Sequence, residues 1–172
     1  GGLHRDDGLD LAQLAAHTQA TGGVAGGEGE ALSNEELLAL EVEVLIPAAV
    51  ENVLTEESAA RVRARLVVEA ANGPTTPGGE VILQDRGIPV VPDILANSGG
   101  VVASYVEWRQ AKSGAMTRAS ETYQTVAEQL EHAFHQVREV VARQQVTDRV
   151  AAQVVAGEEL IATMRDRGWI SA

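Results

Sequence analysis

Two asparagines, each placed among small residues, are the side chains of this 172-residue sequence best suited to hold a flat polar ligand. Asn72 lies in the segment AANGPTT (70–76), and Asn97 lies in PDILANSGG (92–100). A side-chain amide both donates and accepts hydrogen bonds, which suits a ribose or a carboxamide. The neighbouring small residues let such a group approach the backbone. The alternative is that the Asn, Gly and Pro residues here only form turns.

Three short apolar runs near these polar segments predict β-strands. VEVLIP (42–47), RLVVEA (65–70) and IPVV (88–91) are separated by segments of helical pattern at 55–64 and 77–86. Apolar strands that alternate with helices are typical of a parallel sheet covered by helices on both faces. The sequence therefore predicts an α/β fold. The amide and small residues then follow the carboxyl ends of the strands, where such sheets bind ligands.

The first third of the chain carries two further helix patterns. Residues 7–21 have apolar residues on one face and are followed by Gly22, which predicts a helix that ends there. A glycine-rich loop is expected to continue to about residue 32. Ser33 and Glu36 then have the spacing of a capping box, in which each side chain binds the backbone N–H of the other residue.

Two long helices are predicted to end the chain. One covers about residues 118–144, and the other begins at Thr147 as its cap and stops at Gly168. We therefore expect two regions: a sheet-containing region at 1–115 and a C-terminal helical segment at 116–172.

The composition excludes several classes of function. A formal net charge of −12 and a pI near 4.7 argue against nucleic acid as a partner, because phosphate backbones require a basic surface. The sequence has no run of about eighteen apolar residues and no charged-then-apolar leader, so we predict neither a membrane span nor a secretion signal. The absence of cysteine excludes disulfides and thiolate chemistry, and it fits a cytoplasmic location.

The remaining candidates for chemistry are weaker. His132 and His135 have a spacing that fits a metal, but no third ligand lies beside them in the sequence, so we predict no metal site. Asp93 opens a predicted helix and is expected to be its cap rather than an acid–base catalyst. Lys112, the single lysine, lies among polar residues and is expected to be solvated. We assign no catalytic residue to this chain.

Three segments together resemble the nucleotide-binding domain of glutamate dehydrogenases, whose family also contains leucine, phenylalanine and valine dehydrogenases. They are LIPAAVEN (45–52), VVEAANGPTT (67–76) and PDILANSGGVVASYVEW (92–108), and the resemblance runs from residue 1 to about residue 145. It implies a partial Rossmann-like domain that binds NAD or NADP. It also implies that cofactor contacts come from Ala48, Ala49, Asn72, Asn97, Gly99 and Gly100.

The resemblance assigns separate roles to these residues and to two others. The asparagines would lie near the nicotinamide ribose and carboxamide, the alanines beneath the adenosine ribose, and the glycines where a helix starts close to nicotinamide and substrate. Val101 and Ser104 match positions that line the pocket for the substrate side chain. The Ser104 hydroxyl could bind the γ-carboxylate of glutamate, although a serine early in a helix often binds its own helix backbone instead.

The implied reaction is the reversible conversion of L-glutamate, NAD(P) and water to 2-oxoglutarate, ammonia and NAD(P)H. The alternatives are a leucine, phenylalanine or valine dehydrogenase, or a non-catalytic truncated domain that folds and self-associates.

One expected motif is missing. No strand is followed by G-x-G-x-x-G and a helix, and the glycine cluster at 22–29 follows a predicted helix instead. The resemblance places the glycine fingerprint, a substrate domain and a catalytic lysine and aspartate before Gly1. We therefore expect this chain to be the C-terminal part of a dehydrogenase, inactive alone, and to belong to a homo-oligomer that is hexameric at full length.

Overall fold

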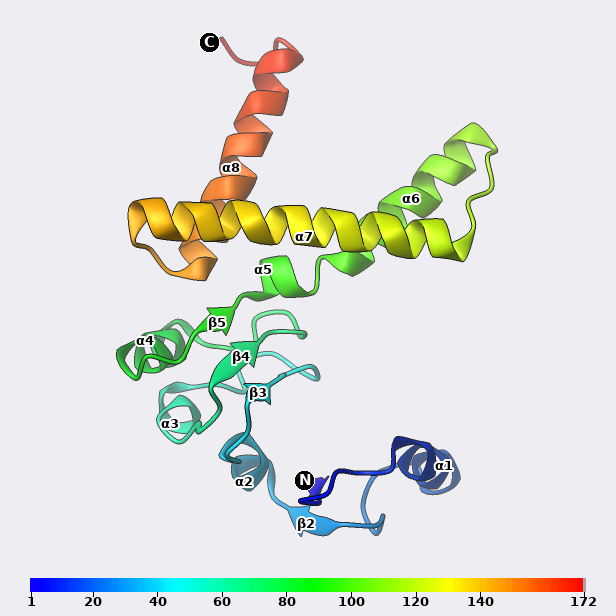
Figure 1. Cartoon of the computed structure of the whole chain (residues 1–172), viewed down its shortest axis with the longest axis vertical. Helices are drawn as coiled ribbons and strands as arrows, with labels where there is room; N and C mark the ends of the chain where they lie inside the picture. Colours follow the sequence, from blue (N-terminus) through cyan, green and yellow to red (C-terminus); the bar gives the residue numbers. More distant parts are fainter. Residues whose placement is uncertain (172) are drawn as a thin grey trace.

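The computed structural model describes residues 1–171, which form three groups of elements along one long axis (Figure 1). Ala172, the last residue of the expected helical segment, lies outside the described residues. The first group contains β1 (Gly2–His4), α1 (Leu11–Thr21), β2 (Glu30–Leu32) and α2 (Asn34–Leu38). The second contains β3 (Val44–Leu45), α3 (Glu56–Ala59), β4 (Leu66–Val68), α4 (Pro77–Asp85) and β5 (Val90–Val91). The third contains α5 (Asp93–Ala96), α6 (Gly99–Ser113), α7 (Ala119–Gln144) and α8 (Asp148–Asp166).

The middle group confirms the predicted α/β fold. Its sheet has the order β3-β4-β5, and both pairs of neighbouring strands are parallel. The core beside this sheet contains the fully buried side chains of Leu54, Val62, Val67 and Leu83. The strands are shorter than the apolar runs predicted. Proline residues follow the first and third strands closely and have no N–H to continue the ladder.

The N-terminal group departs from the prediction. β1 and β2 form an antiparallel pair in which Leu3 lies opposite Ala31, whereas no strand was expected at 2–4 and a loop was expected up to residue 32. Three-residue strands are too short to show the alternating pattern by which a sequence reveals a strand. The first helix also begins later than residue 7, because Asp10 caps it by accepting hydrogen bonds from the amides at the start of α1.

The helix predicted over 55–64 is much shorter than expected, because α3 ends at Ala59. Three other helix signals in the sequence are confirmed. Ser33 and Glu36 form the predicted capping box at 3.2 and 2.8 Å. Thr147 caps α8 by accepting a hydrogen bond from Val150 N at 3.3 Å. Two long C-terminal helices are therefore confirmed. Their contact with α5 buries Leu95 together with a face that α7 and α8 share. Among residues 1–171, no helix is both long and apolar enough to cross a bilayer.

The start of α4 comes so close to its neighbours that only glycine fits. A Cβ atom built on Gly79 would lie 2.1 Å from the backbone oxygen of Leu54, which is itself fully buried. Backbone atoms cannot move aside as a flexible side chain can, so this close approach fixes α4 against the segment before α3.

We expect Gly79→Ala to destabilise the chain by about 1–3 kcal/mol, the usual effect of overpacking. Gly157 provides the matched control, because it lies within α8 and no atom approaches its Cβ position within 4 Å. Gly157→Ala should stabilise the chain by roughly 0.5–1 kcal/mol through helix propensity. Urea unfolding followed by circular dichroism measures both, and equal effects of the two substitutions would contradict the assigned contact.

Candidate functional site

A wide crevice opens where β3 and β4 end and α6 begins. Its volume is about 940 Å³. It is lined by Ala49, Val50, Glu51, Ala70, Ala71, Asn72, Asn97, Gly100 and Val101. The crevice therefore lies beyond the carboxyl ends of parallel strands, the place where open α/β sheets bind their ligands.

The two asparagines are joined within this crevice. Asn97 Nδ2 donates to Asn72 Oδ1 at 2.7 Å and to the backbone oxygen of Ala70 at 3.3 Å. Both amide hydrogens of Asn97 are thus engaged, and its own oxygen remains as an acceptor. Asn72 has the complementary capacity, because its oxygen is used and its NH₂ group can donate. Together they present one acceptor and one donor group, the complement of a carboxamide.

The structure brings five of the eight predicted site residues together at the crevice: Ala49, Asn72, Asn97, Gly100 and Val101. Ala48, Gly99 and Ser104 are not in its lining. A Cβ atom on Gly99 would lie 3.1 Å from Val126 and 3.4 Å from Leu130, so this glycine lets α6 approach α7. Ser104 is exposed on α6, about one helical turn beyond Val101.

The charge of the crevice restricts the groups it can hold. Glu51 is the one charged residue in the lining, and neither lysine nor arginine is present there. A phosphate group would therefore find no cation among these residues. Hydroxyl and amide groups fit better, because carboxylate and amide oxygens accept their hydrogen bonds. The lining thus suits a neutral polar group better than an anion.

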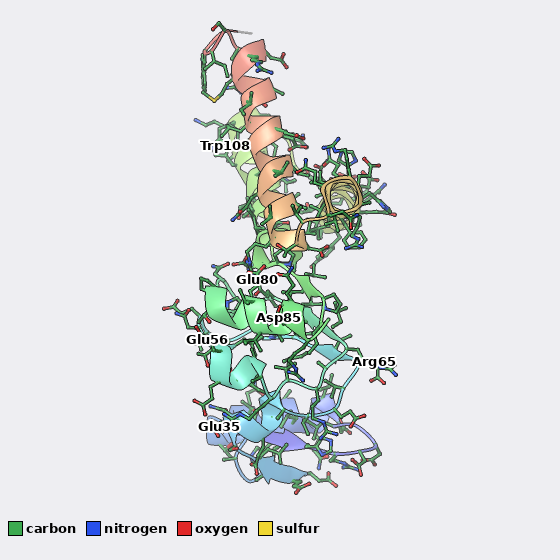
Figure 2. All side chains as sticks on the ribbon, turned by 90° about the vertical axis from the view of Figure 1, so that its left-hand side faces the viewer. Glu35, Glu56, Arg65, Glu80, Asp85 and Trp108 are labelled. Atoms are coloured by element: carbon green, nitrogen blue, oxygen red, sulfur yellow. The ribbon has the colours of Figure 1, made fainter. Side chains whose placement is uncertain are left out.

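A partly buried ion cluster links the sheet to the C-terminal helices. Arg149 of α8 donates from Nη2 to both carboxylate oxygens of Glu69 at 2.8 Å each. Its Nε binds Glu80 at 2.6 Å, and its Nη1 binds Asp93 at 2.9 Å. Glu69 is fully buried. Figure 2 shows Glu80 at the junction between the sheet region and the C-terminal helices.

Sequence reasoning missed this cluster, although two local features could have suggested it. Glu69 is a charged residue directly after the apolar strand LVV, and Arg149 lies in the first turn of a helix among apolar residues. A carboxylate at the end of a buried strand requires a partner. The sequence alone does not reveal which arginine supplies it. The crevice residues Val50, Glu51, Ala70 and Ala71 were also not predicted.

The role predicted for Asp93 is wrong. It is the first residue of α5 rather than its cap, and the cap position belongs to Pro92, which makes no side-chain hydrogen bond. The carboxylate instead accepts from Gly73 N at 2.8 Å, from Ile94 N at 2.8 Å and from Arg149. Asp93 therefore connects the ion cluster to the loop that carries Asn72.

The surroundings shift the ionisation of two members of the cluster. Burial is the largest influence on Asp93 and by itself would raise its pKa. The N–H groups of Gly73 and Ile94 and the Arg149 guanidinium together hold that pKa below its ordinary value. Burial alone would lower the pKa of Arg149, but hydrogen bonds and charges from Glu69 and Glu80 hold it above its ordinary range. Both groups are therefore charged at neutral pH.

The other candidate residues lie apart from the crevice lining. His135 lies 3.9 Å from Glu131 on the exposed side of α7, and no group of three or more potential metal ligands occurs within the described part of the chain. The Lys112 ammonium lies 6.0 Å from the ring centroid of Trp108, near the end of α6.

Comparison with known proteins identifies the family. The model for the Glutamate/Leucine/Phenylalanine/Valine dehydrogenase family matches residues 1–168, nearly the whole chain. The chain belongs to this family. The family suggested by the three motifs is therefore confirmed, and the match extends well beyond them.

The curated relatives include glutamate dehydrogenases specific for NADP and others specific for NAD. The chain is 42% identical over 171 residues to an NADP-specific glutamate dehydrogenase of Saccharolobus shibatae, covering 98% of this chain and 40% of that protein. It is 40% identical over 170 residues to a cryptic catabolic NAD-specific glutamate dehydrogenase of Bacillus subtilis, covering 99% of this chain and 40% of that protein. The chain thus spans about 40% of the length of these curated relatives.

A solved member of the family has the same arrangement of elements. The hetero-hexameric glutamate dehydrogenase of Thermus thermophilus, in a leucine-bound form, superposes with a TM-score of 0.88 at 33% identity. The match covers 100% of this chain and 40% of that one. The Rossmann-like fold expected from the family resemblance is therefore shared over the full length described.

We expect Asp93→Asn to weaken the dependence of stability on pH in the acidic range. Because the folded-state pKa of Asp93 is lowered, the unfolded chain binds more protons, and stability rises with pH. This contribution is present above about pH 4, near the ordinary carboxyl pKa, and is lost as pH falls through the lower folded value.

Urea unfolding midpoints between about pH 5 and pH 3 should therefore fall less steeply in Asp93→Asn than in the wild type. Asp166→Asn, which removes one exposed negative charge near the end of α8, serves as the control. If the slopes of Asp93→Asn and the wild type agree, the assigned ion pair is wrong.

Proposed function

We propose that residues 1–172 form the nicotinamide side of the active site of a glutamate dehydrogenase that uses NAD or NADP. The observation that supports this most directly is the amide pair of Asn72 and Asn97 in a crevice beyond the ends of parallel strands. Family membership and relatives named for glutamate support the choice of reaction.

In this proposal the amide pair orients the nicotinamide. The Asn97 oxygen accepts from the carboxamide NH₂, and the Asn72 NH₂ group donates to the carboxamide oxygen or to a ribose hydroxyl. Asn72 and Asn97 would hold a nicotinamide that would supply the hydride acceptor for the oxidation of glutamate. Gly100, with no atom near its Cβ position, leaves room for the ring beside α6. Ala48 and Ala49 lie after β3, on the side where the adenosine ribose would pass.

The start of α6 would supply one wall of the substrate pocket. Val101 lies at the crevice and its side chain is 73% exposed, so it can contact another molecule without rearrangement. Ser104 lies one turn later and is also exposed. Its hydroxyl would donate to the γ-carboxylate of glutamate, a contact of no use to the apolar side chains of leucine, phenylalanine or valine.

The proposal also divides the work between this chain and the rest of a subunit. The crevice lining contains no lysine or arginine, and the chain matches about 40% of the length of its relatives. In the proposal, the phosphate loop and the catalytic groups belong to the part of these enzymes that the chain does not match. We therefore propose that the 172-residue chain alone does not turn over glutamate. We also propose that the full-length protein assembles into a hexamer, because it belongs to a family with a hexameric member of known structure.

Asn97→Ala in the natural polypeptide that contains this chain should raise the Kd for NADH or NADPH. The loss of a hydrogen-bonding partner costs about 1–3 kcal/mol, so we expect roughly five- to 150-fold weaker binding by fluorescence titration. Asn34→Ala, at an exposed position of α2, should bind the cofactor as the wild type does. Unchanged cofactor binding in Asn97→Ala would reject the proposed site. Separately, the purified 172-residue chain should form no NADH or NADPH from glutamate, and measurable turnover would contradict its proposed inactivity.

Ser104→Val should change which substrate the enzyme prefers. A hydrogen bond to a charged group is worth about 1.5–3 kcal/mol, so kcat/KM for glutamate should fall by roughly ten- to a hundredfold. The value for norvaline, which lacks the carboxylate, should change little. Ser120→Val makes the same substitution on the exposed side of α7 and controls for its effect on a helix. Equal losses for glutamate and norvaline would show that Ser104 does not select the substrate.

A further inference from the structure

The geometry points to Arg149 as a positioning residue that fixes the Asn72–Asn97 pair through Asp93, and this inference rests on the proposed function. Arg149 belongs to α8, far along the chain from both asparagines, and it is not in the crevice lining. It cannot be a catalytic residue in the sense of touching substrate or cofactor. Its connection to the crevice runs through hydrogen bonds that can be followed one by one.

The first connection leads to Asn72. Arg149 Nη1 donates to Asp93 Oδ1 at 2.9 Å, and Asp93 Oδ2 accepts from Gly73 N at 2.8 Å. Gly73 has a φ of +54° and directly follows Asn72. Non-glycine residues rarely adopt this conformation, and no atom approaches the Gly73 Cβ position, so glycine is needed there for the shape of the backbone rather than for space. The Asp93 carboxylate therefore fixes the peptide that orients Asn72.

The second connection leads to Asn97. The backbone N–H of Asp93 donates to Glu69 Oε2 at 2.8 Å, which anchors the first residue of α5 to the ion cluster. Asn97 follows α5 directly, and its backbone N–H donates to the backbone carbonyl oxygen of Asp93 at 3.1 Å. A single helical turn thus separates Asn97 from the anchored residue. Asp93 therefore holds both members of the amide pair, Asn72 through Gly73 and Asn97 through α5.

Electrostatics explains why Arg149 is required for this arrangement. Glu69, Glu80 and Asp93 place three carboxylates around one guanidinium, and Glu69 has no exposure to solvent. Without the cation these like charges repel each other, and Asp93 is the member that borders an open loop. It would turn toward water and release Gly73. A lysine keeps the charge but lacks the planar fork that reaches several acceptors at once.

The test uses the natural polypeptide that contains residues 1–172 and a double-mutant cycle. Arg149→Lys and Asn97→Ala are made singly and together, and the Kd for NADH or NADPH is measured by equilibrium fluorescence titration. We expect Arg149→Lys alone to weaken binding about tenfold, and to add almost nothing when Asn97 is already Ala. Additive effects of the two substitutions would overturn the positioning role.

Two controls separate positioning from general stability. Val62→Ala opens a cavity in the fully buried core and is not in the crevice lining, so it should lower the melting temperature without changing the Kd. Arg138→Gln breaks a different ion pair, in which Arg138 of α7 lies 2.8 Å from Asp148 at the start of α8. This variant should also leave the Kd unchanged. A Kd that follows the melting temperature across all variants would overturn the inference.

The positioning role can also be tested without the cofactor, by determining the structure of a variant. In the crystal structure of unliganded Arg149→Lys, we expect the Asp93–Gly73 bond to be lost and the Asn97–Asn72 contact to exceed hydrogen-bonding distance. Asp93→Ala, which removes the acceptor of the Gly73 N–H, provides the same test if the lysine variant does not fold. An intact amide pair in that structure would overturn the inference. If Asn97→Ala alone leaves cofactor binding unchanged while the amide pair still separates in Arg149→Lys, the proposed function fails and the positioning role stands.

Discussion

A fully buried carboxylate, Glu69, sets the requirement on which much of this structure depends. It lies directly after the middle strand of the parallel sheet, where water cannot reach it. Removing the partner of a buried ion pair typically costs about 3–5 kcal/mol, because the remaining charge is left without compensation. The partner here is Arg149, contributed by the last helix of the fold. The position of α8 relative to the sheet is therefore fixed by one charge requirement as well as by apolar packing.

The same cluster joins stability to the candidate site. Three carboxylates around a single guanidinium leave an excess of negative charge, and backbone N–H groups supply the remaining donors. Two of these donors, on Gly73 and Asp93, belong to the segments that carry Asn72 and Asn97. The polar contacts that satisfy the cluster thus also shape the crevice. An apolar replacement of the cluster could hold α8 in place, but it would not orient these two peptides.

The sequence predicted the features that depend on neighbouring residues. The three strand segments, the capping box at Ser33 and the two long helices all follow from local patterns. Asn72 and Asn97 were predicted to face one ligand because parallel strands end at the same edge. The β1–β2 pair and the partners of Glu69 were missed, because each depends on contacts between distant parts of the chain. No local pattern encodes which of the twelve arginines pairs with Glu69, and Arg149 lies 80 residues away from it in the sequence.

Adjacent glycines at the start of α6 show how closely the crevice depends on the C-terminal helices. Gly100 faces open space at the crevice, whereas Gly99 faces Val126 and Leu130 of α7. A side chain at Gly99 would require the Val126 side chain to shift and would so disturb the contact between α6 and α7 next to Val101. The contacts of α5 with α7 and α8 likewise cross the boundary between the regions proposed at 1–115 and 116–172. The helices after residue 116 therefore support the crevice residues: α7 packs against the start of α6, and α8 supplies the cation that holds Asp93.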